Sequence, residues 1–501
     1  QDVIISYISV FLIIISTFVL TKYQVKFLGK DQYGIISLVN SVIGYVSILD
    51  LGIGQTIIRY ISLYRAKGEN YKIEQIAGYS FKSYIRISVI GLIVGGSILF
   101  VSNMIFPNLT NNQMDLFRIA FLVALINIVL QIPGATFNAI LTAHERFKFL
   151  RGTNTIRSIL RVIIMIILFK LGFRVVMVFL VDLVLNQGIN IINYLVVRYS
   201  LKIKLNFNKL DTNVRKEIYT YSFFVFLGII TDQIFWKTDG IIIGIMGTVN
   251  VVGVYSISGQ IISQYLNICA TFSSVFLPKL THMIAENRPK SEINKFFIKA
   301  SRYQFILVAM ILINYIFLGK QFITLWLGNN MIDAYYYGLV IFISLTVPMF
   351  QTTGYQILYA MNKHKVRSMI YLFNAIINII ISVILFKIYG AIGPALATAI
   401  AMIAGNTVII NIYYKKTLEL KLIDFFYKVC NKTLVVSIII SIVFIVLNRF
   451  TDNGILSFLL KVIIGNILYT IGIYFYTLSK EEKMFILKKL HRGYKLQNSN
   501  L

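Results

Sequence analysis

The sequence predicts an all-α integral membrane protein. Hydrophobic residues make up 57% of the chain, charged residues 14%, and the mean hydropathy is +0.76. Soluble domains average about 45–50% apolar and about 25% charged residues. The apolar residues form fourteen segments near the roughly 20 residues that a spanning helix needs. Runs such as 162–169 do not alternate apolar and polar residues as the strands of a membrane β-barrel do, so the segments are expected to be helices.

The fourteen expected helices follow one another along almost the whole chain. They are 3–20, 33–60, 76–102, 117–143, 154–171, 173–197, 218–246, 250–278, 296–319, 334–360, 366–389, 390–414, 429–447 and 455–478. The first is expected to be a spanning helix because no small-residue cleavage site of a secretory signal follows it. Pro133 and Pro348 occupy nearly equivalent places and predict matched bends, since proline removes a helical hydrogen bond.

An internal repeat divides the first twelve helices into two halves. The sequence at Ile167–Lys170 recurs at Ile384–Lys387, an offset of 217, and Gly34 matches Gly253 at an offset of 219. Both halves begin on the same side, so they are parallel repeats related by a pseudo-two-fold axis along the membrane normal. The expected organisation is an N-terminal six-helix lobe (1–200), a linker (201–217), a C-terminal six-helix lobe (218–416), helices 13 and 14 (417–480) and a tail (481–501) that forms an interfacial helix after Lys480.

Positive charge alternates between successive connections. The formal charge is +28, from 48 Lys and Arg against 20 Asp and Glu. Connections such as 60–75 and 143–153 are rich in Lys and Arg, whereas 103–116 and 247–249 contain none. This positive-inside pattern places both termini and the linker in the cytoplasm, and membrane lipids rather than nucleic acid are the expected partners of the excess charge.

Basic residues inside the apolar segments form the candidate substrate site. A charge facing lipid costs about 2.5–3.5 kcal/mol at the bilayer centre, so such groups usually face a partner or a wet cavity. Lys82 with Arg86, and Arg157 with Arg161, are each four residues apart. The two members of each pair therefore lie on one face of their helix. These basic side chains either snorkel to the inner membrane interface or line a basic cavity that opens to the cytoplasm. The planar guanidinium group of arginine can donate two parallel hydrogen bonds to a phosphate. The candidate basic residues are Arg59, Lys82, Arg86, Arg157, Arg161 and Lys237.

Three acidic residues inside apolar segments are candidates for coupling or gating. Asp50 precedes Gly52 and Gly54, which permit close packing or a bend, while Asp232 and Asp239 flank Lys237. A structural ion pair explains Asp50 equally well. An interfacial cluster near the outer leaflet is the alternative for Asp232 and Asp239.

Several chemistries find no support in the sequence. No Walker-type loop is present, the four histidines are scattered, and no Ser, His and Asp arrangement suggests covalent catalysis. Cys269 and Cys430 fall in apolar segments and give no disulfide framework. We therefore expect no metal and no cofactor, and H⁺ or Na⁺ as a coupling ion if transport is ion-driven.

Three short motifs resemble the polysaccharide branch of the multidrug/oligosaccharidyl-lipid/polysaccharide exporter superfamily, the Wzx-type flippases. They are residues 28–69, with Tyr33-Gly34 and Asp50-Leu51-Gly52-Ile53-Gly54, residues 239–244, and residues 390–397, where Pro394 is atypical. The resemblance covers nearly the whole chain. It implies a non-enzymatic flippase that carries undecaprenyl-diphosphate-linked oligosaccharides for O-antigen, capsule or exopolysaccharide assembly in a bacterial inner membrane. It also implies alternating access, and polymerase or other assembly proteins as further partners.

Two other functions remain open at this stage. A drug or cation exporter of the same superfamily would favour an acidic cavity, whereas the embedded groups here are mostly basic. A polytopic glycosyltransferase or polymerase generally needs a sizeable external loop with catalytic acids, and the expected external connections contain few acids, none of them paired.

Overall fold

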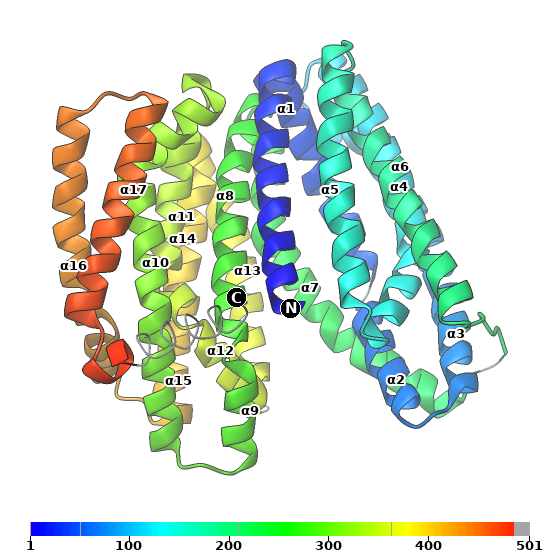
Figure 1. The fold of residues 1–501 in the computed structure, drawn as a ribbon. Coiled ribbons are helices and arrows are strands. Elements are labelled where there is room, and N and C mark those ends of the chain that lie inside the picture. The colour runs from blue at the N-terminus through cyan, green and yellow to red at the C-terminus, as the bar shows by residue number, and fades with distance from the viewer. Residues whose placement is uncertain (1, 51, 209, 362, 485–501) are drawn as a thin grey trace, which may run out of the picture. The chain divides into compact units, whose positions relative to one another are not determined.

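The protein is helical throughout the part that its computed structural model describes. This part comprises residues 2–50, 52–208, 210–361 and 363–484, and it contains no β-strand. The prediction of an all-α protein is confirmed (Figure 1). Most of the interfacial helix expected after Lys480 falls at 485–501, outside the described residues.

The chain divides into two compact units by its internal contacts. The first unit comprises residues 1–259 and 375–397, and the second comprises 260–374 and 398–501. The elements up to the middle of α8 therefore belong to the first unit. These are α1 (Asp2–Val46), η1 (Ser47–Asp50), α2 (Ile53–Ala66), α3 (Asn70–Ile105), α4 (Asn111–Ala143), α5 (Phe147–Lys170), α6 (Val175–Leu195), η2 (Val196–Ser200), α7 (Thr212–Met246) and α8 (Val249–Ser274).

The remaining elements belong to the second unit, apart from most of α13 and the residues that follow it up to 397. They are α9 (Leu277–Ala285), α10 (Lys290–Leu327), η3 (Asn329–Met331), α11 (Asp333–Phe350), α12 (Thr352–Ala360), α13 (His364–Tyr389), η4 (Gly390–Ile392), α14 (Gly393–Ala401), η5 (Met402–Ile409), α15 (Ile410–Leu418), α16 (Leu422–Phe450), α17 (Ile455–Gly472) and η6 (Ile473–Thr477). In the first unit α7 contacts α1 and α2, and the expected lobe boundary at 201–217 stays a prediction.

Within the described residues, ten helices are long and apolar enough to cross a membrane, and eleven if the bent pair α8–α9 forms one span. Two of these ten, Ile8–Leu49 with 42 residues and Lys365–Leu418 with 54 residues, exceed a single crossing. At about 1.5 Å per residue each is at least twice as long as the roughly 30 Å hydrocarbon core. The α7 helix, which carries Asp232, Lys237 and Asp239, is not among the ten. The chain is thus a multi-pass membrane protein, and the number fourteen stays a prediction.

Two glycines with positive φ divide the first expected helices at places that differ from the predicted boundaries. The expected connection 21–32 is helical except at Gly29, whose φ of 71° breaks α1. The expected helix 33–60 is interrupted at Gly52, which has φ 68° and precedes α2. Only glycine adopts such angles without strain, so the breaks follow from the residue type. A hydrophobic pattern alone does not locate them.

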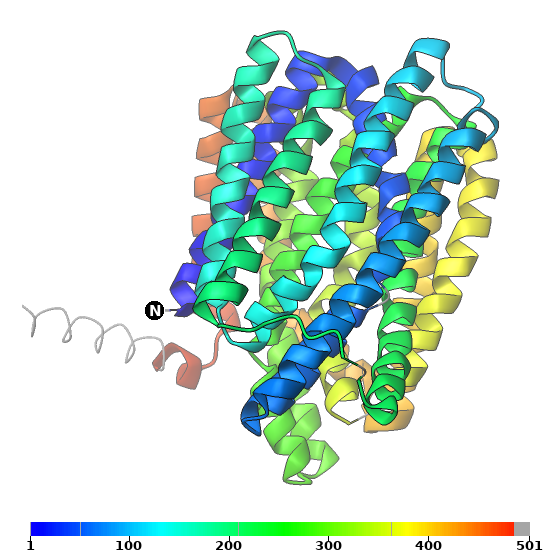
Figure 2. The same cartoon turned by 90° about the vertical axis from the view of Figure 1, so that its right-hand side faces the viewer.

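Pro133 lies within α4, and the carbonyl that it leaves without a helical partner is satisfied from a neighbouring helix. The proline has no N–H to donate to the carbonyl of Val129. Ser88 of α3 donates its hydroxyl to that oxygen at 2.8 Å. The α4 helix packs against α3 and α6, and Figure 2 shows these helices running side by side. Pro133 therefore lies where α4 has neighbours that can accommodate an irregular backbone.

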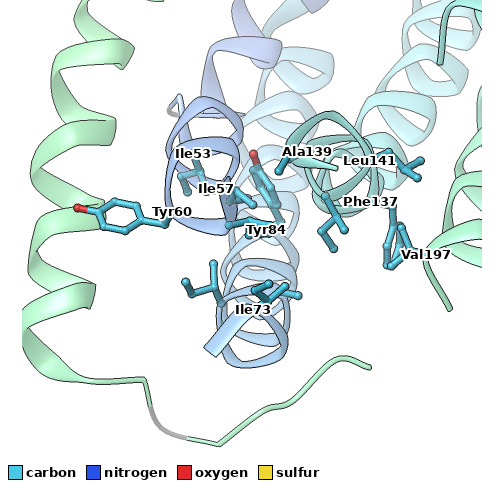
Figure 3. Close-up of a cluster of buried hydrophobic side chains, with 14 of the residues drawn as sticks. Ile53, Ile57, Tyr60, Ile73, Tyr84, Phe137, Ala139, Leu141 and Val197 are labelled. Atoms are coloured by element: carbon cyan, nitrogen blue, oxygen red, sulfur yellow. The ribbon is translucent and has the colours of Figure 1, made fainter. Parts of the chain in front are cut away.

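A cluster of buried side chains fixes α2 against α3 and α4. Ile53 and Ile57 of α2 pack with Tyr84 of α3 and Phe137 of α4 (Figure 3). Figure 3 shows Tyr60 pointing away from α2, and its hydroxyl donates to a carboxylate oxygen of Glu217 in α7 at 2.8 Å. The cluster therefore holds rigidly the short helix that follows the glycine break.

The second unit has a separate core, in which α10 packs with α16 and α17 (Figure 1). Phe444 of α16 and Tyr469 of α17 are among its buried residues. Lys461 of α17 is only 1% exposed. Its ammonium group donates to Gln321 Oε1 at 3.1 Å and to the carbonyl oxygen of Asp452 at 3.3 Å. This buried cation was not among the residues that the sequence analysis selected. It connects α17 to α10 and to the connection between α16 and α17.

Candidate functional site

A cavity of about 330 Å³ opens in the first unit where α2, α4, α6 and α7 meet. Among the residues that the structure describes, no charged and no aromatic side chain lines it. Four of its lining residues are amides, on α2, α4 and α6, and the others are glycines or aliphatic residues. The lining residues are Gly52, Gly54, Gln55, Ile58, Gln131, Gly134, Ala135, Asn138, Ala139, Asn190 and Ile229.

Glycines bring the backbones together around this cavity. A Cβ on Gly52 would lie 2.6 Å from the side chain of Val225 in α7, and a Cβ on Gly134 would collide with the amide of Asn190 in α6. A larger residue at either position would therefore push α7 or α6 away. The Asp-Leu-Gly-Ile-Gly motif that the sequence analysis noted thus lies beside the cavity.

A chain of hydrogen bonds connects the cavity to the arginines of α5. Arg157 donates to Asn186 Oδ1 at 2.6 Å, and Asn186 donates to Asn127 Oδ1 at 3.4 Å. Gln187 also donates to Asn127 Oδ1, at 3.3 Å, and accepts from Asn190 at 3.0 Å. Polar residues on α4, α5 and α6 therefore form one connected network, and Asn190 is its member in the cavity wall.

The second arginine of α5 is paired with an acid that the sequence analysis did not consider. Arg161 donates to both carboxylate oxygens of Asp182 in α6, at 2.5 and 2.6 Å. The exposed fractions of these side chains are 30% for Arg161 and 20% for Asp182. Arg157 and Arg161 against one aspartate leave one net positive charge in this group. Arg157 also has a buried Nε without a hydrogen-bond partner, so the group retains a donor.

The other predicted basic residues lie elsewhere on the first unit. Lys82 and Arg86 are exposed, one turn apart on α3, and Arg59 is exposed on α2. The α4 helix contacts both α3 and α5, so the two basic pairs lie on helices that flank it. Lys237 of α7 is half-buried, with Cγ 3.3 Å from the place of a Cβ on Gly44. A shared substrate-binding role for these residues stays a prediction.

The three predicted acids have different surroundings. Asp239 is only 4% exposed, and its carboxylate accepts hydrogen bonds from Tyr255 at 2.6 Å and from Ser382 at 3.1 Å. It therefore links α7, α8 and α13 within the first unit. Asp232 is exposed. Asp50 ends η1, and its side chain is not among those that the structure describes. Coupling or gating by these acids stays a prediction.

Equivalent residues of the two repeats contact each other where α1 meets α8. Ser37 and Ser256, which are 219 positions apart, lie with their hydroxyl oxygens at 2.7 Å. A Cβ on Gly253 would lie 3.1 Å from the carbonyl oxygen of Lys30, and a Cβ on Gly34 would collide with that of Val249. Lys30 and Val249 are also 219 apart. Such reciprocal contacts arise where a two-fold axis passes through an interface.

Comparison with known proteins assigns the family. Residues 1–284 match the family described as "Polysaccharide biosynthesis protein". The chain belongs to this family. It is also 22% identical over 418 residues to the "Uncharacterized membrane protein EpsK" of Bacillus subtilis (strain 168), covering 80% of this chain and 81% of the relative. The resemblance inferred from residues 28–69 and 239–244 is thus confirmed.

Two solved structures illustrate the fold of this chain. The lipid II flippase MurJ in an inward closed conformation aligns with a TM-score of 0.71 and 18% identity, over 94% of this chain and 97% of MurJ. An inward-facing multidrug resistance MATE family transporter of the MOP superfamily aligns with a TM-score of 0.68 and 15% identity, over 81% and 95% of the two chains. At 18% and 15% identity these likenesses show the fold of the chain.

The two halves of the repeat differ in charge at equivalent positions. At the offset of 217, Arg157 and Arg161 of α5 correspond to Asn374 and Asn378 of α13. Both asparagines are buried, 2% and 1% exposed. The same face of the equivalent helix is therefore polar in both halves but charged only in the first. The offset reveals this difference from the sequence alone. Asp182 is a charged residue inside the expected helix 173–197, a signal that the sequence analysis did not use.

A second cavity, of about 590 Å³, lies in the second unit between α9 and the start of α10. Its basic lining residues are Lys279, His282, Arg288, Lys295 and Lys299. Arg288 donates to Glu286 at 2.8 Å and to Glu292 at 3.3 Å, and its hydrogen bond lowers the pKa of the Glu286 carboxyl. The positive-inside pattern accounts for a basic surface at this connection, so we do not assign it a separate function.

Proposed function

We propose that this protein is a flippase that moves an undecaprenyl-diphosphate-linked oligosaccharide from the cytoplasmic to the outer leaflet of a bacterial inner membrane. The family match supports the polysaccharide pathway, and the fold shared with a lipid flippase supports lipid transport. The proposal covers O-antigen, capsule and exopolysaccharide assembly alike. Both termini lie in the cytoplasm in this proposal, as the positive-inside pattern predicts.

The net positive charge at Arg157 and Arg161 is the observation that carries the proposal. Arg161 is paired with the carboxylate of Asp182, whereas Arg157 donates to the amide of Asn186 and its Nε is buried without a partner. A diphosphate offers acceptor oxygens that a guanidinium binds in a bidentate manner. Asp182 would hold Arg161 in place until the anion arrives. A cationic drug would gain no comparable attraction from this group.

Alternating access is the mechanism that we propose for the transfer. The head group enters an opening on the cytoplasmic side while the lipid chain remains in the bilayer. The contacts at Gly34, Ser37, Gly253 and Ser256 then separate and expose the head group to the other side. Asp50, Asp232 and Asp239 are candidates for coupling this cycle to H⁺ or Na⁺.

A translocation assay in proteoliposomes tests the function. A lipid-linked oligosaccharide is incorporated with the protein, and inversion of its head group is followed by access of an added glycosidase. We expect Arg86→Ala and Arg161→Ala to reduce inversion at least tenfold while the matched exposed variant Arg449→Ala retains it. New glycosidic linkages would instead indicate a polymerase, and dye efflux without inversion a drug exporter.

A further variant separates a chemical role of Arg161 from a structural one. Asp182→Asn removes the acid but leaves both guanidinium groups. If Arg161 binds the anion, Asp182→Asn retains inversion while Arg161→Ala loses it. Equal loss in both variants would show that the ion pair only holds α5 against α6. Wild-type inversion in Arg86→Ala and Arg161→Ala would refute the basic site.

A further inference from the structure

The cavity between α2, α4, α6 and α7 contains polar groups that the protein itself does not use. Gln55 and Gln131 are exposed, and neither side chain makes a hydrogen bond within the described part of the chain. Polar groups inside a membrane protein are normally paired because an unmet hydrogen bond is costly in hydrocarbon. Amides left open toward a cavity therefore indicate water or a polar ligand there.

Two pairs of amides in the second unit are bonded to each other instead. Gln351 and Asn411 donate to each other at 2.9 and 3.1 Å, and Asn314 and Asn466 do so at 3.0 and 3.3 Å. These amides satisfy one another and tie helices together. Gln55 and Gln131 have no comparable amide partner within the described part of the chain.

The hydrogen-bond network also sets which group Asn190 offers to the cavity. Its Nδ2 donates to Gln187 Oε1 at 3.0 Å, and Gln187 in turn donates to Asn127 Oδ1, the atom on which the branch from Arg157 also ends. The carbonyl oxygen of Asn190 thus remains available as an acceptor. Gln55 and Gln131 each offer both an acceptor and a donor. A ligand that matches this wall carries several groups that donate and accept together, as hydroxyls and acetamido groups do.

We propose that this cavity binds one uncharged glycosyl residue of the transported lipid-linked oligosaccharide. This proposal rests on the proposed function and assigns the sugar and the diphosphate to different places. Its described lining contains no cation, so we assign the diphosphate to Arg157 and Arg161 instead. The same described lining contains no acid and no aromatic ring, which an organic cation would favour. A volume of about 330 Å³ lies at the small end of ligand sites and fits a single ring.

Two short-chain probes test the assignment on the full chain in phosphatidylcholine nanodiscs. One is the octyl β-glycoside of N-acetylglucosamine, which is uncharged, and the other is octyl diphosphate. The cavity variants are Gln131→Leu and Asn190→Leu, which keep size but remove hydrogen bonding. The matched control is Asn112→Leu, an exposed amide of the same helix α4 outside the cavity. Binding constants are measured by equilibrium titration, and folding is checked by thermal unfolding.

We expect saturable binding of the glycoside that is about fivefold weaker in each cavity variant and unchanged in Asn112→Leu. Gln131→Leu is the decisive variant, because its side chain makes no hydrogen bond that folding needs. Absent glycoside binding, or equal binding in Gln131→Leu and Asn112→Leu, would overturn the glycosyl site even if octyl diphosphate binds. If octyl diphosphate fails to bind while the glycoside result holds, the diphosphate part of the proposed function fails instead.

Discussion

Replacing Gly34 with alanine should weaken the reciprocal contact between α1 and α8. The added Cβ would collide with the backbone carbonyl of Val249, which does not move without displacing α8. The equivalent change Gly253→Ala places a Cβ 3.1 Å from the carbonyl oxygen of Lys30, which is tight but not a collision. Both changes add one methyl group to a glycine, and they differ in how close that group comes to the facing backbone carbonyl.

The structure allows the two effects to be ranked. Overpacking a well-packed contact costs about 1–3 kcal/mol. We place Gly34→Ala near the upper end, at about 2–3 kcal/mol, because backbone must shift, and Gly253→Ala near about 1 kcal/mol. Gly259→Ala is the matched control, since a Cβ added at this position of α8 would meet none of the neighbouring atoms within 4 Å. At Gly259 alanine is favoured over glycine by up to about 1 kcal/mol, because alanine has the higher helix propensity.

Cysteine crosslinking between α1 and α8 measures how often the two helices are in contact. Ser37 and Ser256 have hydroxyl oxygens 2.7 Å apart, so cysteines at these positions should oxidise to a disulfide. The background variant lacks Cys269 and Cys430. A cost of about 2–3 kcal/mol lowers the ratio of contacting to separated protein by roughly thirty- to over a hundredfold.

Several outcomes would refute this reasoning. If Gly34→Ala crosslinks as fast as Gly259→Ala, the two backbones do not approach as closely as the structure places them. If Gly253→Ala has the larger effect, the ranking from the carbonyl distances is wrong. Loss of crosslinking in Gly259→Ala would show that any change in α8 disturbs the contact.

Two further predictions concern stability. Lys461→Met should lower the free energy of unfolding by about 2 kcal/mol, because the acceptors on Gln321 and Asp452 lose their buried donor; an unchanged midpoint in detergent-induced unfolding would contradict it. Burial lowers the pKa of His144 below its usual 6.5, so the folded chain resists protonation more than the unfolded chain does. Stability should therefore fall as the pH drops below about 6.5, and His144→Asn should remove this part of the slope in thermal unfolding between pH 7.5 and 5.5.

The sequence predicted the fold class because membrane helices impose a strong and simple pattern. Long apolar runs and alternating basic connections follow from the bilayer alone. Helix boundaries were predicted less well. The expected connection 21–32 is mostly helical, and Gly29 and Gly52 rather than polar residues make the breaks. A positive φ at a glycine depends on how neighbouring helices pack, which a hydropathy pattern does not encode.

The candidate site was predicted only in part for a related reason. Charged residues in apolar segments are conspicuous, so Arg157 and Arg161 were found. Asp182 is a charged residue inside the expected helix 173–197 and was as conspicuous as Asp50, but the sequence analysis did not consider it. Asn190 was missed because a single amide in an apolar segment has many explanations until its neighbours are known. The amide network crosses α4, α5 and α6, and its members become recognisable only when the helices are placed together.

The repeat explains why the charge belongs to one half. Gly34 with Gly253 and Ser37 with Ser256 keep the same residue at the same repeat position, because each position contacts its own equivalent and a change in one half would disturb the other. Arg161 and Asn378 occupy equivalent positions but have different partners, Asp182 and Ser382. No symmetric contact constrains them, so they are free to differ. Under the proposed function, a substrate with one anionic group needs one cationic site rather than two, and a charge in one half alone would meet that need.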